Sequence, residues 1–215
     1  MKIKQNRIIV IDAGFSFLGS IAAVRSGYPF RGPLAEVPAG GVLVTQMKDV
    51  DPLTGLEWHS VVRAELTGRK EPDWLQTGDI LFVPRGQRYF GSSIGPPPGL
   101  AVCGPHLMVL RVWPDAGVTP DFLAWQINQP PVQKLLWAAA EGTSQLSVRI
   151  SEIEGLRIAI PPIDQQLKIV ALAQAAARER QALNRLIVNR EQELAAIAST
   201  LALAAGLDRK QEAKT

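Results

Sequence analysis

The side chains that point most directly to binding chemistry are basic and amide groups close to predicted turns. Arg and Gln can each form two hydrogen bonds to a base edge, and Lys grips phosphate. Loops on a rigid sheet are where such side chains usually lie. The sequence leaves open the alternative that they are solvated loop charges. The candidates for nucleic-acid contact are Arg25, Arg31, Arg63, Arg69, Lys70, Arg85, Gln87, Arg88 and Tyr89.

Residues suited to catalysis are sparse. The two histidines, His59 and His106, and the single cysteine, Cys103, do not form a cluster at metal-ligand spacing, so no zinc site is expected. There is no P-loop, no G-x-G-x-x-G after a strand and no G-x-S-x-G motif. Cys103 and His106 are interpreted as a structural pair in a Gly-Pro turn. We therefore expect a protein that is not an enzyme, with no metal and no cofactor of its own.

Composition and charge set limits on the class of protein. The chain has 215 residues, of which 47% are hydrophobic, with 18 Gly and 16 Pro, so a real core and many turns are expected. The net charge of +3 comes from 23 basic and 20 acidic residues. That balance is too even to indicate nucleic-acid binding by itself. Any basic patch must therefore be formed by folding.

The expected location is the cytoplasm. One cysteine permits no intrachain disulfide, which fits a reducing compartment. Residues 1–7 are basic and 8–24 largely apolar, as in a signal peptide, but Asp12, Gly14 and Gly19 interrupt that pattern. No run approaches the roughly 20 apolar residues of a membrane span, so no membrane association is expected.

The first part of the chain has the pattern of short strands separated by turns, because apolar runs alternate with Gly, Pro and Asp clusters. Helical patterns follow. Thr119 suits an N-cap and Pro120 the first helical position, while Pro130 and Pro131 begin a second helix that Gly142 ends. We expect these two helices to form a hairpin packed on the sheet. The predicted strands are 7–11, 41–44, 58–62, 79–83, 107–112 and 156–160, the helices 119–128 and 132–140, and a short turn 151–155.

A long helix is predicted near the C-terminus. Asp164 can cap a helix that continues to about residue 205, and Gly206 suits its end. At about 1.5 Å per residue it is about 60 Å long, which indicates a coiled coil or a helical arm. Apolar positions step by four and three, the heptad spacing of paired helices, with Arg180 and Arg190 in the same seam. The predicted partner surface is Ile169, Ala173, Ala176, Leu183, Ile187, Leu194, Ile197 and Leu201.

These patterns predict an α+β fold in three parts. A β-rich recognition head with a small helical hairpin occupies 1–162, and one long helix for dimerisation occupies 163–206. A flexible tail occupies 207–215. The alternative for the helix is that it folds back onto its own head as ordinary core.

Several motifs occur in a definite order. Gly78-Asp79-Ile80-Leu81 is followed by Arg85-Gly86, then by the helix 119–127 and the small-residue loop 142–145. An apolar strand, Pro161-Pro162 and Gln165-Gln166 then precede the long helix. This order resembles type I restriction–modification specificity subunits, over about residues 15–205. Gln165 departs from the family, which usually has an acidic residue there.

The resemblance implies a target-recognition domain that reads one half of a split double-stranded DNA site. The long helix would pair, set the spacing of two such domains and dock a DNA methyltransferase. Adenine methylation from S-adenosylmethionine would belong to that partner, and a restriction subunit is a further candidate partner. Full specificity subunits usually hold two recognition domains, whereas this chain has room for one. It therefore resembles a half subunit that pairs with itself or with a different half.

Two alternatives to DNA recognition follow from the residues. One is a protein-interaction adaptor that binds the methyltransferase without reading DNA. The other is a nuclease in the head that uses Asp49, Asp51 and Glu57. Turn positions explain these carboxylates more simply.

Overall fold

The computed structural model describes residues 14–205, apart from 53, 67–70, 87 and 141–145. They divide into two units, Met1–Ala171 and Leu172–Thr215. The strands are β1 Gly14–Phe17, β2 Ala22–Ser26, β3 Val42–Thr45, β4 Val50–Asp51, β5 Gly55–Leu56, β6 Val62–Ala64, β7 Ile80–Val83, β8 Phe90–Ser93, β9 Ala101–Cys103, β10 Met108–Val112 and β11 Arg157–Ile160. The helices are α1 Leu18–Ile21, η1 Met47–Asp49, η2 Trp58–Ser60, α2 Pro120–Ile127, α3 Pro130–Ala139, α4 Ile150–Glu154 and α5 Ile163–Ala204.

The first unit is organised around a four-stranded antiparallel sheet in the order β2-β10-β7-β8. Successive side chains of a strand point to opposite faces. Ile80 and Phe82 of β7 accordingly belong to one core cluster, and Leu81 and Val83 to another. All four are at most 2% exposed. The sheet is therefore buried on both faces, which explains why β7 is a continuous apolar run.

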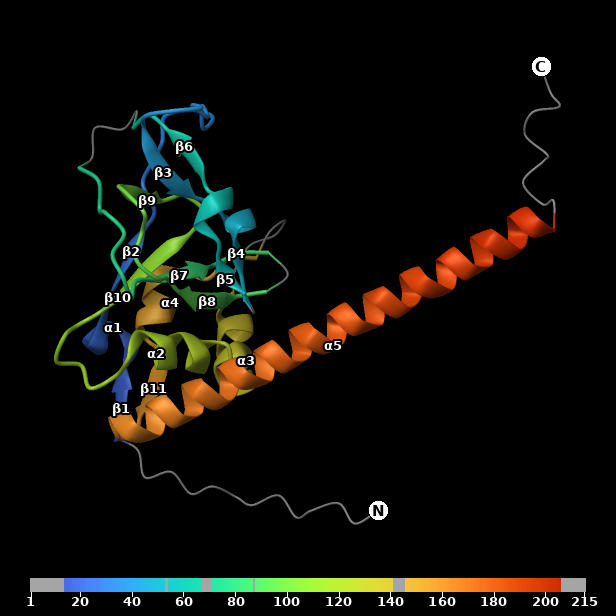
Figure 1. Ribbon diagram of the computed structural model, residues 1–215. Coiled ribbons are helices and arrows are strands. Elements are labelled where there is room, and N and C mark those ends of the chain that lie inside the picture. The colour runs from blue at the N-terminus through green and yellow to red at the C-terminus, as the bar shows by residue number, and fades with distance from the viewer. Residues whose placement is uncertain (1–13, 53, 67–70, 87, 141–145, 206–215) are drawn as a thin grey trace, which may run out of the picture. The chain divides into compact units, whose positions relative to one another are not determined.

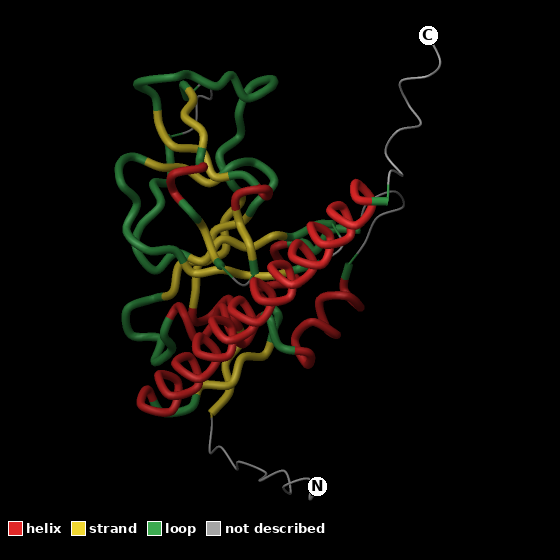
Figure 2. The backbone as a smooth tube through the Cα atoms, turned by 45° about the vertical axis from the view of Figure 1, so that its right-hand side comes forward, coloured by secondary structure: helices red, strands yellow, loops and turns green. Residues whose placement is uncertain are grey.

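Helices cover one face of this sheet. The larger core cluster joins Ile80, Phe82 and Leu110 to buried residues of α1, α2, α3 and α4. Figures 1 and 2 show α2, α3 and α4 together on the side of the sheet opposite β3, β6 and β9. The first turns of α5 also contribute, through buried Val170 and partly buried Ile169. The prediction of two helices packed on the sheet is confirmed.

A second sheet lies on the other face, in the order β6-β3-β9. Its strands β3 and β9 are parallel, with Val44 opposite Val102. Leu43 and Cys103 share a core cluster with the central sheet, and Val44 packs with Tyr28 on the opposite side. Figure 1 shows these three strands stacked above the central sheet. The head is therefore α+β, as predicted.

Amide side chains of α2 tie it to two strands. The Gln126 amide accepts a hydrogen bond from the Ala159 N–H (2.7 Å) and donates one to the Ala159 carbonyl (3.1 Å). Asn128 makes the same pair of bonds with Gly91, at 2.9 and 2.8 Å. Each amide thus takes the place of a neighbouring strand and satisfies backbone groups at a sheet edge. The predicted N-cap is also confirmed, because the Thr119 hydroxyl accepts from the Phe122 N–H.

Gln166 anchors the first turns of α5. Its side chain is buried, and its amide oxygen accepts from the Thr119 N–H at 2.8 Å. The amide nitrogen donates to the carbonyls of Gly117 and Pro161, both at 2.8 Å. All three partners are backbone groups outside α5. The first unit therefore extends past the boundary predicted at residue 162, and ends at Ala171.

The second unit is the rest of α5. The predicted helix is confirmed in length, since α5 has 42 residues. No described residue from 172 to 205 is buried. Ile169 of the predicted partner surface is partly buried and packs against the core of the first unit, and its contact with a partner stays a prediction. The exposed large apolar residues of this unit are Leu172, Leu183, Leu186, Ile187, Val188, Leu194, Ile197, Leu201 and Leu203.

Other predictions had mixed outcomes. The strands expected at 41–44, 79–83, 107–112 and 156–160 appear as β3, β7, β10 and β11, within one residue at each end. The strand predicted at 58–62 is wrong: η2 occupies most of it, because the Ser60 hydroxyl and N–H both bond the Glu57 carbonyl. The strand 7–11 and the tail 207–215 lie outside the described residues. In the described part of the chain, no helix is long and apolar enough to cross a membrane.

Candidate nucleic-acid interface

The turn between β7 and β8 carries two of the predicted basic residues. The two strands are antiparallel, with Val83 opposite Phe90, so residues 84–89 close a tight connection at one end of the sheet. Gly86 has a φ of +100°, a conformation that side chains with a Cβ rarely adopt. Arg88 is exposed and Arg85 is partly exposed. Arg85 and Arg88 therefore lie close together in the chain, on either side of the reversal between the two strands.

A distant segment packs on this turn. Arg85 forms an isolated antiparallel bridge with Ser147, and the Val148 N–H donates to the Pro84 carbonyl at 2.9 Å. Arg149 follows directly and is exposed. Residues about 60 positions apart in the chain are thus held side by side by backbone hydrogen bonds.

Tyr89 corrects the list of DNA contacts. It is 1% exposed, so its ring cannot meet a ligand at the surface. The ring instead packs against Trp137 of α3, with centroids 4.7 Å apart. Its role in this structure is to join α3 to the β7–β8 turn.

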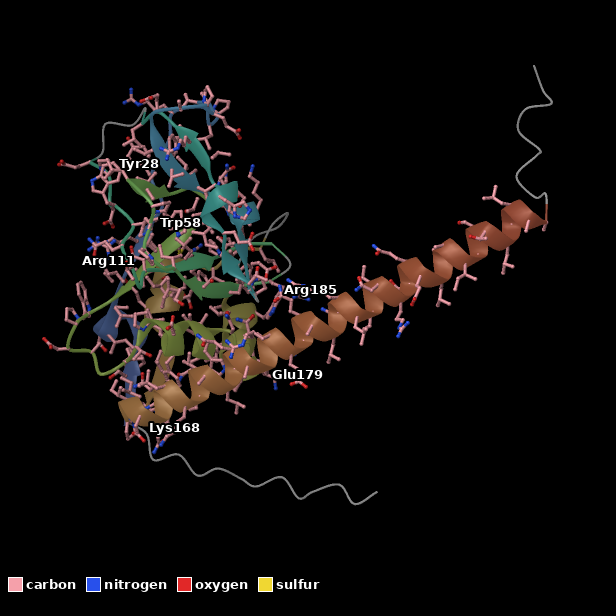
Figure 3. All side chains as sticks on the ribbon, viewed as in Figure 1. Tyr28, Trp58, Arg111, Lys168, Glu179 and Arg185 are labelled. Atoms are coloured by element: carbon pink, nitrogen blue, oxygen red, sulfur yellow. The ribbon has the colours of Figure 1, made fainter. Side chains whose placement is uncertain are left out.

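Arg25 lies in a network of charges. Its Nη1 donates to Asp73 Oδ2 at 2.6 Å, and the other Asp73 oxygen accepts from Arg111 Nη1 at 3.2 Å. Arg111 (labelled in Figure 3) also donates from Nε and Nη2 to the two oxygens of Asp79, each at 2.7 Å. Asp79 is 1% exposed, and its hydrogen bonds from Arg111 raise the pKa of the Arg111 guanidinium. The aspartate of the Gly78-Asp79-Ile80-Leu81 motif is thus a buried counter-ion, and Arg25 is already neutralised by Asp73.

The other predicted contacts do not gather at the same place. Arg63 lies on β6, opposite Leu43, where its Nη1 donates to the Gly40 carbonyl at 3.4 Å. Arg31 is exposed in the segment between β2 and β3. Arg69, Lys70 and Gln87 lie outside the described residues. The structure brings Arg85 and Arg88 together and places Arg25 and Arg63 on other strands, and the part that each plays in DNA contact stays a prediction.

Two of the three carboxylates of the nuclease alternative bond turn amides, and the third, Glu57, lies 3.5 Å from His59 Nε2. Asp49 accepts from the Gln46 N–H and Asp51 from the Thr54 N–H, both at 2.8 Å. Burial raises the pKa of Asp49, against the lowering effect of its bond to Gln46. Among the residues that the structure describes, no group of three His, Cys, Asp or Glu could hold a metal ion.

The predicted pair of Cys103 and His106 is separated by burial. Cys103 is 2% exposed, and burial raises the pKa of its thiol far above the usual value. His106 is exposed in the turn between β9 and β10. A buried thiol with a raised pKa is not a nucleophile.

Sequence reasoning did not single out Trp137, which packs on Tyr89, or Arg149, which follows the segment bonded to the β7–β8 turn. Lys134 lies three residues before Trp137 and was also not singled out. Lys134 and Trp137 lie on α3 and Arg149 at the start of α4, so no local pattern links them to Arg85. The signal in the sequence for nucleic-acid contact is a basic residue close to a predicted turn between strands. These residues do not lie in such a turn. Tertiary packing alone brings Trp137 and the segment before Arg149 to the β7–β8 turn.

No protein-family model matches the sequence, and no curated protein matches it. Solved structures do match. One, from work on complex assembly and conformational transition of the type I R-M system, has a TM-score of 0.64 at 16% identity and covers 91% of this chain and 46% of that chain.

Two specificity subunits match in the same way. The HsdS subunit from Thermoanaerobacter tengcongensis has a TM-score of 0.57 at 17% identity, covering 81% of this chain and 39% of that chain. The type I restriction-modification system S subunit from M. genitalium has a TM-score of 0.54 at 16% identity, covering 98% and 52%. The chain therefore has the fold of these S subunits and spans about half their length. The resemblance predicted from the order of motifs is confirmed at the level of the fold.

Proposed function

We propose that this chain is a DNA sequence-specificity subunit of a type I-like restriction–modification or DNA-methylation system. The observation that carries the proposal is the match over 91% of this chain to 46% of a chain from a type I R-M study. The matched part of that chain would correspond to one head and one long helix. The head would read one half of a bipartite site and would itself catalyse nothing. A partner methyltransferase would bind S-adenosylmethionine and act in the cytoplasm.

Dimerisation would supply the second head. The helix from Leu172 onward exposes an apolar seam that is unfavourable in water on an isolated helix. A second copy, or a second half subunit, would cover it in an antiparallel pair. By two-fold symmetry, a homodimer would read an inverted repeat.

The apolar surface of this helix is wider than one seam. Leu172 and Leu186 are 70% and 54% exposed, and each lies one residue before a seam position. A two-stranded coiled coil needs only the narrow seam, whereas helices in larger bundles carry the wider stripe. The extra apolar positions support a further partner on the same helix, and we assign that place to the methyltransferase.

The function is tested by sequencing the methylated bases of DNA. Plasmid DNA is isolated from cells that contain a type I methyltransferase subunit from the same genome, with and without this chain. We expect methylation at one bipartite motif only when the chain is present. Association with the methyltransferase without any effect on the methylated motif would establish the adaptor and refute the proposal.

The reading head is tested separately by salt titration. The double variant Arg85→Ala with Arg88→Ala should weaken duplex binding and lower the slope of log affinity against log salt by about 2, one unit for each lost phosphate contact. Lys168→Ala, which changes an exposed lysine outside the predicted contacts, is the control and should leave the slope unchanged. An unchanged slope in the double variant would remove these two residues from the interface.

The dimer is tested on the helix. Leu183→Asp with Ile187→Asp places two charges in the seam without touching the head, and should convert the dimer to a monomer in light scattering. The exposed substitution Gln181→Asp, outside the seam, is the control. A chain that is monomeric before substitution would refute self-pairing.

A further inference from the structure

We infer that Lys134 and Arg149 complete a basic patch with Arg85 and Arg88, and that this patch binds the phosphate backbone of duplex DNA beside Trp137. The inference rests on the proposed function and adds residues that the sequence did not indicate. The basic patch is defined as these four basic residues.

Two contacts place the four residues together. The bridge between Arg85 and Ser147 sets Arg149 beside the β7–β8 turn. The ring contact between Tyr89 and Trp137 sets α3 against the same turn, next to Arg88. Lys134 lies three residues before Trp137, so both occupy neighbouring positions on one side of α3. Figure 1 shows α3 close to β8 and α2.

The charge of these segments is positive on balance. The described residues 84–86, 88–89, 130–140 and 146–154 carry Arg85, Arg88, Lys134 and Arg149 against two carboxylates, Glu152 and Glu154. The chain as a whole is almost balanced, with 23 basic and 20 acidic residues. Folding has therefore concentrated positive charge here, which is the electrostatic signature of a nucleic-acid surface.

Arg85, Arg88 and Lys134 differ from other basic residues of the chain in their ion pairing. Arg25, Arg111 and Lys168 are each paired with an aspartate at 2.6 to 3.2 Å. In the described part of the chain, no such pair involves Arg85, Arg88 or Lys134, and the Nε of Arg85 is buried without a hydrogen-bond partner. A phosphate oxygen supplies both the missing acceptor and the missing counter-charge, and Arg binds it through two N–H groups.

Trp137 gives the patch a flat apolar element. It is 45% exposed, while Tyr89 beneath it is buried. A supported ring of this kind packs on sugars and bases at nucleic-acid surfaces, between phosphate contacts. Exposed arginine and tryptophan also mark protein interfaces. The excess of positive charge favours DNA as the occupant, and an acidic protein surface is the competing outcome of the test.

The test compares single and double variants of the full chain, bound to a duplex of mixed sequence across a salt series. Lys134→Ala and Arg149→Ala should each lower the salt slope by about 0.9, and the pair by about 1.8. The wild-type chain should bind more tightly than the double variant, and the ratio of the two affinities should fall about 12-fold between about 0.05 M and about 0.2 M salt. Lys168→Ala, an equally exposed lysine on α5, is the control and should leave the slope unchanged.

Three results would count against the inference. If the wild-type chain binds the duplex and the double variant has the wild-type slope, the patch does not contact phosphate. If the double variant keeps DNA binding but loses the methyltransferase in co-purification, the surface faces a protein. If the wild-type chain and its methyltransferase complex do not bind duplex DNA, the proposed function itself fails. Circular dichroism of each variant confirms that the fold is retained.

Discussion

The buried pair of Asp79 and Arg111 makes a sharp prediction about stability. Asp79 is 1% exposed and accepts from two Arg111 nitrogens at 2.7 Å, and from the Gln76 N–H at 2.8 Å. Removing one partner of a buried ion pair costs about 3 to 5 kcal/mol, because the other charge stays buried. Arg111 is 22% exposed and keeps Asp73. We therefore expect Asp79→Ala to cost about 3 kcal/mol.

Tryptophan fluorescence during urea unfolding is the appropriate assay. All five tryptophans lie between residues 58 and 137, so the signal reports the first unit and not the long helix. With a slope of about 2 kcal/mol per M, a loss of about 3 kcal/mol lowers the urea midpoint by about 1.5 M. Asp115→Ala, an exposed loop carboxylate, should change stability by less than about 0.5 kcal/mol.

A double variant separates the pair from its surroundings. Asp79→Leu with Arg111→Met removes both charges and leaves neither unpaired, so it should be less destabilising than Asp79→Ala alone. If Asp79→Ala costs under about 1 kcal/mol, or if the double variant is the worse of the two, the assignment of Asp79 as a buried counter-ion is refuted.

Three further predictions follow from packing. A Cβ on Gly27 would lie 1.8 Å from a backbone oxygen, so Gly27→Ala should cost more than about 3 kcal/mol in urea unfolding, while Gly95→Ala, with open space around it, should be neutral. Burial raises the pKa of Cys103, so its thiol should not react with a thiol reagent at pH about 8 until the protein is denatured, and fast native reaction would contradict this. Gln166→Leu leaves three backbone groups without their hydrogen-bond partner and should lower the free energy of unfolding by about 3 kcal/mol. Gln165→Leu is the control, and a fall in its Tm equal to that of Gln166→Leu would count against this role of Gln166.

Parts of the fold were accessible from local patterns, and others were not. The helix N-cap at Thr119, the strand at Asp79 to Val83 and the 42-residue helix all follow from caps, breakers and apolar runs. The sequence did not indicate strands β1, β2, β4, β5, β6, β8 and β9. β8 contains Gly91, Ser92 and Ser93, which are poor strand formers, and it exists because β7 and Asn128 satisfy its backbone.

The site shows the same division. Residue type and nearness to a turn were enough to single out Arg85 and Arg88, but equally Arg25, whose charge Asp73 neutralises. A local sequence does not record which carboxylate lies across a sheet edge. For the same reason, the local sequence does not show that Trp137 packs against the ring of Tyr89.

The sequence by itself determined that the chain has a β-rich head and one long helix with an apolar stripe. Those features depend on interactions between residues a few positions apart: caps, turn glycines and the spacing of apolar side chains. Only the packed structure shows that Asp79 is a counter-ion, that Ile169 packs on the core of the head, and that the segment before Arg149 lies beside Arg85. Burial and charge pairing depend on neighbours distant in the chain, so they are defined only once the sheets and helices have packed.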